Sequence, residues 1–133
     1  MRPVLIVEAN PVVRITLKAL LSLRFPSIEV EEACNGEGAL SLFRKTHPFL
    51  IFMDIGLPDG NGLELTRAIK EADPGTEVII LTTYDIPEHR REAFSSGASD
   101  FFTKGNVKVN QITSWVAFAL ETKKGLERSA ACS

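Results

Sequence analysis

The stretch FLIFMDIGLPDGNG, residues Phe49–Gly62, begins as an unbroken apolar run and ends in a polar, glycine-rich loop. A short apolar run bounded by turn residues predicts a strand buried on both faces, as in the parallel sheets of α/β proteins. Phe49–Met53 would form that strand, and Asp54 follows it directly. Because open α/β sheets bind ligands and perform chemistry at the carboxyl ends of their strands, Asp54 is the residue around which we expect the function to be organised.

Outward from this strand, the chain alternates predicted strands with predicted helices. The other strands are expected at Pro3–Val7, Ile28–Ala33, Glu77–Leu81 and Asp100–Lys104. Ile28–Ala33 alternates apolar and acidic residues, which is typical of a strand near an edge. The alternation predicts an α/β fold with a doubly wound, five-stranded parallel sheet and helices on both faces.

Helix boundaries follow from capping residues and prolines. Asn10 and Pro11 predict a helix start, and Asp85 with Glu88 resembles a capping box. The spacing of apolar residues predicts that each helix buries one face. In the helix Leu63–Ala72, this face would contain Leu65 and Ile69, and Ala68 is a further candidate. The helices are expected from Pro11 to Phe25, at Gly36–Thr46 and Leu63–Ala72, from Asp85 to Ser95, and at Asn110–Lys123. One domain would span 1–124, with 125–133 as a fraying tail.

Composition excludes several classes of function. The chain has 133 residues, 44% apolar and 24% charged, with a formal charge of −2. No basic stripe supports nucleic-acid binding, and the apolar runs are too short to span a membrane. Cys34 and Cys132 have no C-x-x-C spacing. We therefore expect a reduced, cytoplasmic protein that contacts neither nucleic acid nor membrane.

Four predicted strand ends deliver polar groups to one edge of the sheet: Glu8, Asp54, Thr82 and Lys104. A carboxylate nucleophile beside a hydroxyl, an ammonium and a second carboxylate suits phosphoryl transfer, which requires mainly positioning and positive charge. Acidic groups could also hold a Mg²⁺ ion. Each residue also has a plainer interpretation. Asp54 could be a turn residue, Thr82 a β-branched strand residue, Lys104 a surface lysine, and Glu8 a solvated loop acid.

The chain resembles the response-regulator receiver (CheY-like) domains of two-component signal transduction. The motifs LIVEANPVVR, MDIGLPDGNGLEL, VIILTTYD and GASDFFTK carry this resemblance, in the expected order and over about Val4 to Lys123. The first motif is most similar to receivers whose regulators carry a C-terminal helix-turn-helix. The resemblance implies a flavodoxin-like strand order of 2-1-3-4-5.

The resemblance also implies roles for individual residues. Asp54 matches the phosphoacceptor, Thr82 the hydroxyl that moves toward the phosphoryl group, and Lys104 the lysine that pairs with it. Phe101 matches the aromatic switch residue. The metal site would comprise Glu8, Asp54 and the backbone carbonyl of Gly56, with Mg²⁺ as cofactor. Such a receiver catalyses only its own phosphorylation and dephosphorylation and is not otherwise an enzyme.

The sequence departs from the family pattern at Ala9, where a second acidic residue is usual. The missing acid is a direct Mg²⁺ ligand in the family, so its loss weakens the expected site. Gly105 replaces a common proline, and the branched Thr83 would narrow access to Asp54. Ala9 favours an alternative function, a phosphorylation-independent pseudo-receiver that acts as a protein-interaction module. A flavodoxin-like flavin protein is disfavoured, because the acidic, proline-stiffened Glu8–Pro11 turn is unlike a phosphate-binding loop.

As partners, the resemblance implies a histidine kinase or phosphotransfer protein, and an output partner protein or a C-terminal effector domain beyond this chain. It also allows a homodimer through the face of the fourth helix, fifth strand and fifth helix. Trp115 could belong to the core or to such a partner surface. His47 and His89 show no metal-ligand spacing, and Asp59 and Asp85 are expected to be turn and cap residues.

Overall fold

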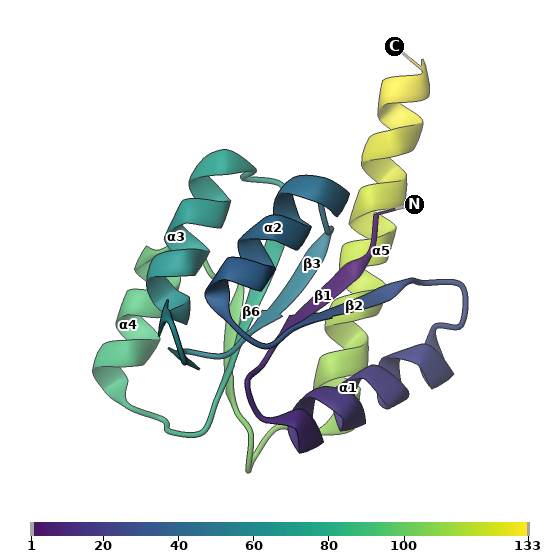
Figure 1. The fold of residues 1–133 in the computed structure, drawn as a ribbon. Coiled ribbons are helices and arrows are strands. Elements are labelled where there is room, and N and C mark those ends of the chain that lie inside the picture. The colour runs from purple at the N-terminus through teal and green to yellow at the C-terminus, as the bar shows by residue number, and fades with distance from the viewer. Residues whose placement is uncertain (1, 133) are drawn as a thin grey trace.

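A computed structural model describes the backbone of residues 2–132 and the side chains of residues 2–122. Its elements, in chain order, are β1 (Val4–Val7), α1 (Pro11–Arg24), β2 (Val30–Ala33), α2 (Gly36–Thr46), β3 (Leu50–Met53), β4 (Gly56–Leu57), β5 (Gly60–Asn61), α3 (Gly62–Ala72), β6 (Glu77–Thr82), α4 (Pro87–Ser95), β7 (Asp100–Thr103) and α5 (Val109–Cys132). A central sheet separates the helices into two groups (Figure 1).

The central sheet has five strands in the order β2-β1-β3-β6-β7, and every pair in it is parallel. This order corresponds to the predicted 2-1-3-4-5 topology, with β2 at one edge as the alternating sequence indicated. The register aligns Val7 with Met53 and Met53 with Ile80. The residues that follow β1 and β3 therefore leave the sheet at the same edge.

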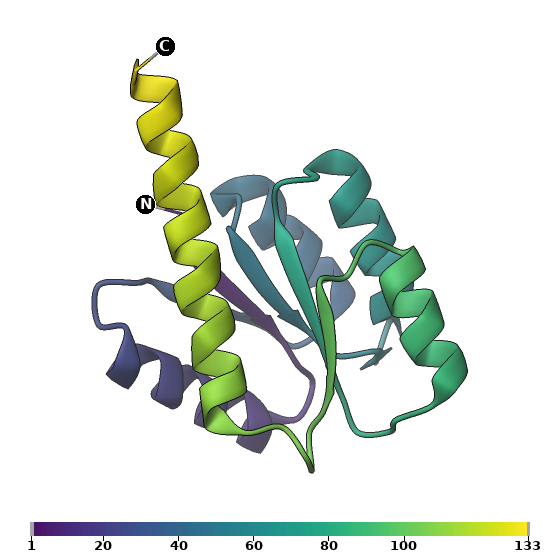
Figure 2. The same cartoon turned by 180° about the vertical axis from the view of Figure 1, so that it is seen from behind.

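Two apolar clusters hold the helices against the sheet. Alternate strand residues such as Leu5 and Ile51 pack with α2, α3 and α4, while Ile6 and Phe52 pack with α1 and α5. In Figure 1, α2 lies in front of the sheet. In Figure 2, which shows the molecule from behind, α5 lies in front, so the two helices cover opposite faces. Strands buried on both faces explain why the runs are apolar throughout instead of alternating.

Most predicted boundaries agree with the structure to within two residues. Asn10 caps α1, since its side-chain oxygen accepts the N–H of Val12 at 2.9 Å. The loop after Asp54 was expected to be irregular, but it contains the short antiparallel hairpin β4–β5. Two-residue strands built on Gly56 and Gly60 carry no alternating pattern, so the sequence offers no signal for them.

Two local predictions were wrong. Asp85 and Glu88 do not form a capping box. Ile86 is the N-cap of α4, with no side-chain cap bond, and Asp85 forms an ion pair with Arg90 instead. Pro87 takes the first helical turn and leaves Asp85 one position too early to cap. Ala68 is exposed, whereas Leu65 and Ile69 are buried as expected.

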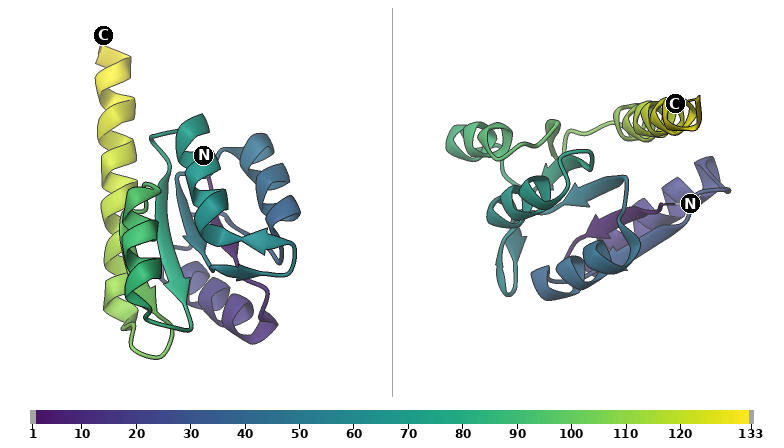
Figure 3. Two further views of the ribbon diagram at one scale, coloured as in Figure 1. Left: turned by 90° about the vertical axis from the view of Figure 1, so that its left-hand side faces the viewer. Right: turned by 90° about the horizontal axis from the view of Figure 1, so that it is seen from above.

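The last helix is longer than predicted. It continues past Lys123 to Cys132 and extends beyond the rest of the domain (Figure 3). The segment expected to be a tail, residues 125–133, is thus helical as far as 132. Apart from Gly125, this segment contains good helix formers such as Leu, Glu, Arg and Ala. The prediction of a tail rested on the small and polar residues of the segment and gave these helix formers too little weight. Whether this end frays stays a prediction.

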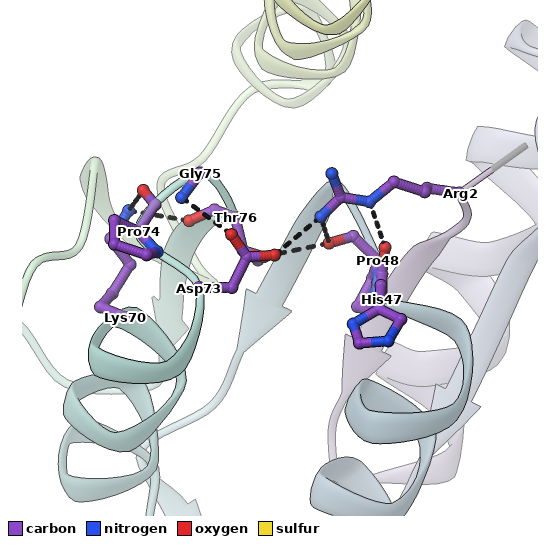
Figure 4. Close-up of polar contacts among 8 residues, drawn as sticks. All are labelled: Arg2, His47, Pro48, Lys70, Asp73, Pro74, Gly75 and Thr76. Atoms are coloured by element: carbon purple, nitrogen blue, oxygen red, sulfur yellow. Dashed lines mark hydrogen bonds and ion pairs between the residues drawn. The ribbon is translucent and has the colours of Figure 1, made fainter.

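A polar network closes the opposite edge of the sheet, where the strands begin (Figure 4). Asp73 follows α3 and accepts hydrogen bonds from the Gly75 N–H at 3.0 Å and the Thr76 hydroxyl at 3.0 Å. Arg2 forms an ion pair with Asp73 at 2.9 Å and donates to the carbonyl of Pro48. This network ties the segments that lead into β1, β3 and β6 together, far from Asp54.

Candidate functional site

The structure brings together three charged residues from three strand ends. Lys104 follows β7, and its Nζ atom lies 2.5 Å from Oε1 of Glu8 and 3.1 Å from Oδ2 of Asp54. The side chains of Glu8, Asp54 and Lys104 are only 5%, 11% and 17% exposed. The interpretations of Glu8 as a solvated acid and of Lys104 as a free surface lysine were therefore wrong.

Local backbone contacts fix the position of each carboxylate. The Asp54 N–H donates to the Val7 carbonyl at 3.0 Å, which continues the β1–β3 pairing, and the Ile55 N–H donates to Asp54 Oδ1 at 2.8 Å. The second oxygen of Glu8, Oε2, accepts the N–H of Asn10 at 2.9 Å. The Asn10–Pro11 helix start that the sequence indicated therefore also orients Glu8.

The charges of the cluster shift its proton affinities. Burial raises the pKa of the Asp54 carboxyl, and the nearby negative charge of Glu8 raises it further, with Lys104 offsetting part of both effects. Burial acts to lower the pKa of the Lys104 ammonium, but its hydrogen bonds to Glu8 and Asp54 outweigh this and raise it. The lysine is accordingly held in its charged form, shared between two carboxylates.

Thr82 adjoins this cluster, and Phe101 lies three residues before Lys104. Thr82 ends β6, is 5% exposed and pairs with Thr103 in the sheet, and its backbone carbonyl accepts the N–H of Lys104 at 2.7 Å. Phe101 lies within β7 and is buried, with the guanidinium of Arg90 stacked 4.7 Å from its ring centre. The aromatic switch candidate is therefore in its inward position.

The candidate metal site offers few donors. Among the residues described, no group of three or more His, Cys, Asp or Glu side chains is placed to hold a metal ion. The donor set comprises the carboxylates of Glu8 and Asp54, with the Gly56 backbone two residues beyond Asp54. Protein-bound Mg²⁺ commonly uses one or two carboxylates and completes its shell with water and phosphate oxygens. The donors therefore fit Mg²⁺ in kind and number, although Glu8 already binds Lys104 and Asn10.

Sequence reasoning missed two contributors to the site. Arg14, on α1, donates from Nη1 to the backbone carbonyls of Glu8 at 2.8 Å and Ala9 at 3.4 Å, which holds the acidic turn in place. Gly62, at the start of α3, packs against the backbone of Asp54. Neither contact involves neighbours in the chain, so only the folded arrangement reveals them.

Comparison with known proteins agrees with this geometry. The response regulator receiver domain family matches residues 4–117. The chain belongs to this family. Among relatives of this receiver, the chemotaxis protein CheY of Halobacterium salinarum is 33% identical over 103 residues, which cover 77% of this chain and 84% of CheY. The transcriptional regulatory protein TrcR of Mycobacterium tuberculosis is 32% identical over 127 residues, which cover 96% of this chain and 48% of TrcR.

Solved receiver structures show the same fold. A CheY-like receiver domain protein from Methanospirillum hungatei is 25% identical, with a TM-score of 0.83 and coverage of 94% of this chain and 98% of that protein. A LuxR-family two-component response regulator from Aurantimonas is 28% identical, with a TM-score of 0.79 and coverage of 90% and 85%. Receivers are signalling modules of two-component systems that interact with histidine kinases and output domains, and they generally bind Mg²⁺ at their phosphorylation site.

The chain spans about half the length of the curated transcriptional regulators that it matches, for example 48% of TrcR and 42% of TcrX from the same organism. No helix in the described part of the chain has the length and apolar character needed to cross a membrane.

Proposed function

We propose that this receiver accepts a phosphoryl group on Asp54 from a phosphohistidine of a histidine kinase or phosphotransfer protein. The observation that carries the proposal is the Lys104 ammonium, 3.1 Å from Asp54 Oδ2 at the carboxyl edge of the sheet. This arrangement pairs a carboxylate nucleophile with a cation that can also neutralise the incoming phosphoryl oxygens. Positioning and positive charge of this kind are what phosphoryl transfer requires.

In the proposed step, an oxygen of the ionised Asp54 carboxylate attacks phosphorus. A new O–P bond forms, the P–N bond of the phosphohistidine breaks, and the imidazole nitrogen leaves with the electron pair. Lys104 binds a phosphoryl oxygen, and the Thr82 hydroxyl at the end of β6 donates a hydrogen bond to another. The product is an acyl phosphate on Asp54. Water later attacks its phosphorus, the O–P bond to Asp54 breaks, and inorganic phosphate leaves while the carboxylate is regenerated.

Glu8, Asp54 and the Gly56 carbonyl would hold Mg²⁺, which when bound supplies positive charge near the phosphoryl oxygens. Glu8 would have to give up a contact with Lys104 or Asn10 to do so, because both of its oxygens already accept hydrogen bonds. We therefore expect weaker Mg²⁺ binding than in receivers with a second acid at the position of Ala9.

The signal would leave through Phe101 and α5. Asp100 precedes Phe101 in β7, and its Oδ2 atom accepts the indole N–H of Trp115 on α5 at 2.8 Å. The backbone N–H of Phe101 donates to the other oxygen of Asp100, Oδ1, at 2.8 Å. A rearrangement of Phe101 that shifts this backbone would thus reach α5 through Asp100. We propose that the output lies in a partner protein or in an effector domain beyond this chain. The chain matches only about half of the length of the transcriptional regulators TrcR and TcrX, which supports this proposal. A homodimer through α4, β7 and α5 stays a prediction.

The test is intact-mass spectrometry after incubation with acetyl phosphate, with and without Mg²⁺. We expect the mass of one phosphoryl group to be gained in the presence of Mg²⁺, and no gain in Asp54→Asn. Asp85→Asn is the matched control, since Asp85 is an exposed aspartate after the neighbouring strand, and it should be phosphorylated like the wild type. A gain that persists in Asp54→Asn would overturn the assignment of the acceptor.

Ala9 favours one second candidate, a pseudo-receiver that binds partners without phosphorylation. Under this alternative, neither acetyl phosphate nor a cognate kinase adds a phosphoryl group at any Mg²⁺ concentration. Ala9→Asp separates the two cases. If the metal site is merely weakened, the variant should reach half-maximal phosphorylation at a Mg²⁺ concentration about tenfold lower than the wild type.

A further inference from the structure

The tip of the β4–β5 hairpin contacts the N-terminus of α2. Asp59, in the turn between the two strands, uses both carboxylate oxygens. Oδ1 accepts the N–H of Gly36 at 2.7 Å and Oδ2 accepts the N–H of Glu37 at 2.9 Å. Both donors belong to the first turn of a helix, where N–H groups lack partners within the helix and the helix dipole favours negative charge. These two backbone hydrogen bonds lower the pKa of Asp59, so the carboxylate stays ionised.

The base of the same hairpin borders the phosphorylation site. Gly56 pairs with Asn61, and Leu57 pairs with Gly60. The N–H of Gly62 donates to the Ile55 carbonyl at 2.8 Å and closes the hairpin directly after Asp54. Leu57, in the first strand of the hairpin, is buried. The segment from Asp54 to Gly62 is therefore attached at its base to the site and at its tip to α2.

We propose that Asp59 is a positioning residue of the phosphorylation site: its two bonds to the N-terminus of α2 fix the β4–β5 hairpin and thereby hold the Gly56 carbonyl beside Asp54. The chemical part of this inference rests on the proposed function, because Gly56 matters there as a ligand for Mg²⁺. The positional part concerns only the hairpin and can be measured without phosphorylation.

Capping of α2 alone does not account for Asp59. Asn35 already serves as the N-cap of α2, and its side-chain oxygen accepts the N–H of Gly38 at 2.7 Å. Asp59 adds a contact between two segments that are distant in the chain. A Cβ at Gly36 would lie 3.2 Å from Asp59 Oδ1, so the glycine allows the carboxylate to approach this closely. Two charge-assisted bonds at one carboxylate also fix its orientation, which a single bond would not.

The test compares Asp59→Ala with Asp59→Asn and with Asp73→Asn. Asp73→Asn disrupts the polar network at the opposite edge of the sheet. It therefore serves as a control that lowers overall stability but leaves the contacts of the hairpin intact. The first measurement is hydrogen exchange, by NMR, at the amides of Gly36, Glu37 and Leu57. We expect these amides to exchange faster in Asp59→Ala, with Asp59→Asn intermediate because it keeps one acceptor oxygen. In Asp73→Asn, exchange at these three amides should rise only as far as the lower overall stability makes complete unfolding of the domain more frequent.

The second measurement is the Mg²⁺ concentration that gives half-maximal phosphorylation by acetyl phosphate. Removal of a group that orients a metal ligand commonly costs about tenfold or more in metal affinity, so we expect about a tenfold increase in Asp59→Ala. Asp73→Asn should leave this concentration unchanged.

The two proposals fail in different ways. Unchanged exchange at Leu57 in Asp59→Ala would overturn the positioning role, whatever the phosphorylation data show. A rise in exchange at Gly36 and Glu37 alone would also overturn it, because Asp59 would then act only on α2. A wild-type protein that takes up no phosphoryl group would overturn the proposed function, and exchange at Leu57 would still decide whether Asp59 holds the hairpin.

Discussion

Gly62 lies so close to Asp54 that a Cβ atom on it would be 1.9 Å from the Asp54 backbone carbonyl oxygen. No side chain fits this gap, and the obstacle is backbone, which cannot rotate away. The start of α3 can therefore pass directly behind the phosphoacceptor candidate only because residue 62 is glycine. The hydrogen bond from the Gly62 N–H to Ile55 depends on the same close approach.

Gly62→Ala should therefore destabilise the domain by about 3 kcal/mol, at the upper end for overpacked sites. The added methyl group must push the Asp54 backbone away from α3. Chemical denaturation measures the loss, and Gly60→Ala is the control, because a Cβ there meets nothing within 4 Å. Equal stability of the two variants would show that the chain relaxes around residue 62 without cost.

Lys104→Met should cost about 3 kcal/mol in the free energy of unfolding, because Glu8 and Asp54 would be left as two buried carboxylates without their cation. The loss should shrink in Glu8→Gln/Lys104→Met, which removes one of the stranded charges, so that the two substitutions are not additive. Lys108→Met, at an exposed lysine nearby, should change stability by no more than about 0.5 kcal/mol. An additive double variant would argue against a shared lysine.

Asp54→Asn should raise stability at neutral pH by about 1 kcal/mol, the usual size of a single stabilising change. Burial and the charge of Glu8 raise the pKa of Asp54 above its ordinary value of 3.8, so the folded state loses stability when this carboxyl ionises. The gain should shrink as the pH falls through the raised folded-state pKa of Asp54 and vanish below 3.8, where the carboxyl is protonated in both the folded and unfolded states. Thermal unfolding at several pH values measures it, with Asp85→Asn as the exposed control.

The sequence alone predicts the main framework of this site. Unbroken apolar runs identify the parallel strands, and Asp54, Thr82 and Lys104 follow or end three of them, so their convergence at one edge results from topology. The ion pair between Glu8 and Lys104 was not predicted, because it depends on how Arg14 and Asn10 shape the turn after β1. The contact of Asp59 with the N-terminus of α2 was missed for a similar reason: its partners, Gly36 and Glu37, belong to another strand-to-helix connection.

Short elements and helix ends were the least predictable parts of the fold. The β4–β5 hairpin contains only Gly56, Leu57, Gly60 and Asn61 as strand residues, too few for any periodicity to appear. For α4, Pro87 determined the start more strongly than the cap-like spacing of Asp85 and Glu88. In both cases a single backbone constraint outweighed the local pattern.

Asp73→Asn should destabilise the domain by about 1–2 kcal/mol at neutral pH through weakened hydrogen bonds to Gly75, Thr76 and Arg2. Burial acts to raise the pKa of Asp73, but the bonds from Thr76, Gly75 and Arg2 outweigh it and lower the pKa below its ordinary value of 3.8. The ionised Asp73 thus stabilises the folded state above pH 3.8, and this contribution is lost as the pH falls through the lower, folded-state pKa.

The difference in stability between wild type and Asp73→Asn should consequently be constant near neutrality and narrow only in acid, below pH 3.8. Urea denaturation at several pH values from neutrality down into this acid range measures the difference. Glu71→Gln, at an exposed carboxylate in the last turn of α3, should follow the wild type within about 0.5 kcal/mol throughout. If the difference instead stays constant into strong acid, Asp73 acts through packing and not through its charge. The network of Figure 4 would then hold the strand starts together without any contribution from the Arg2 ion pair.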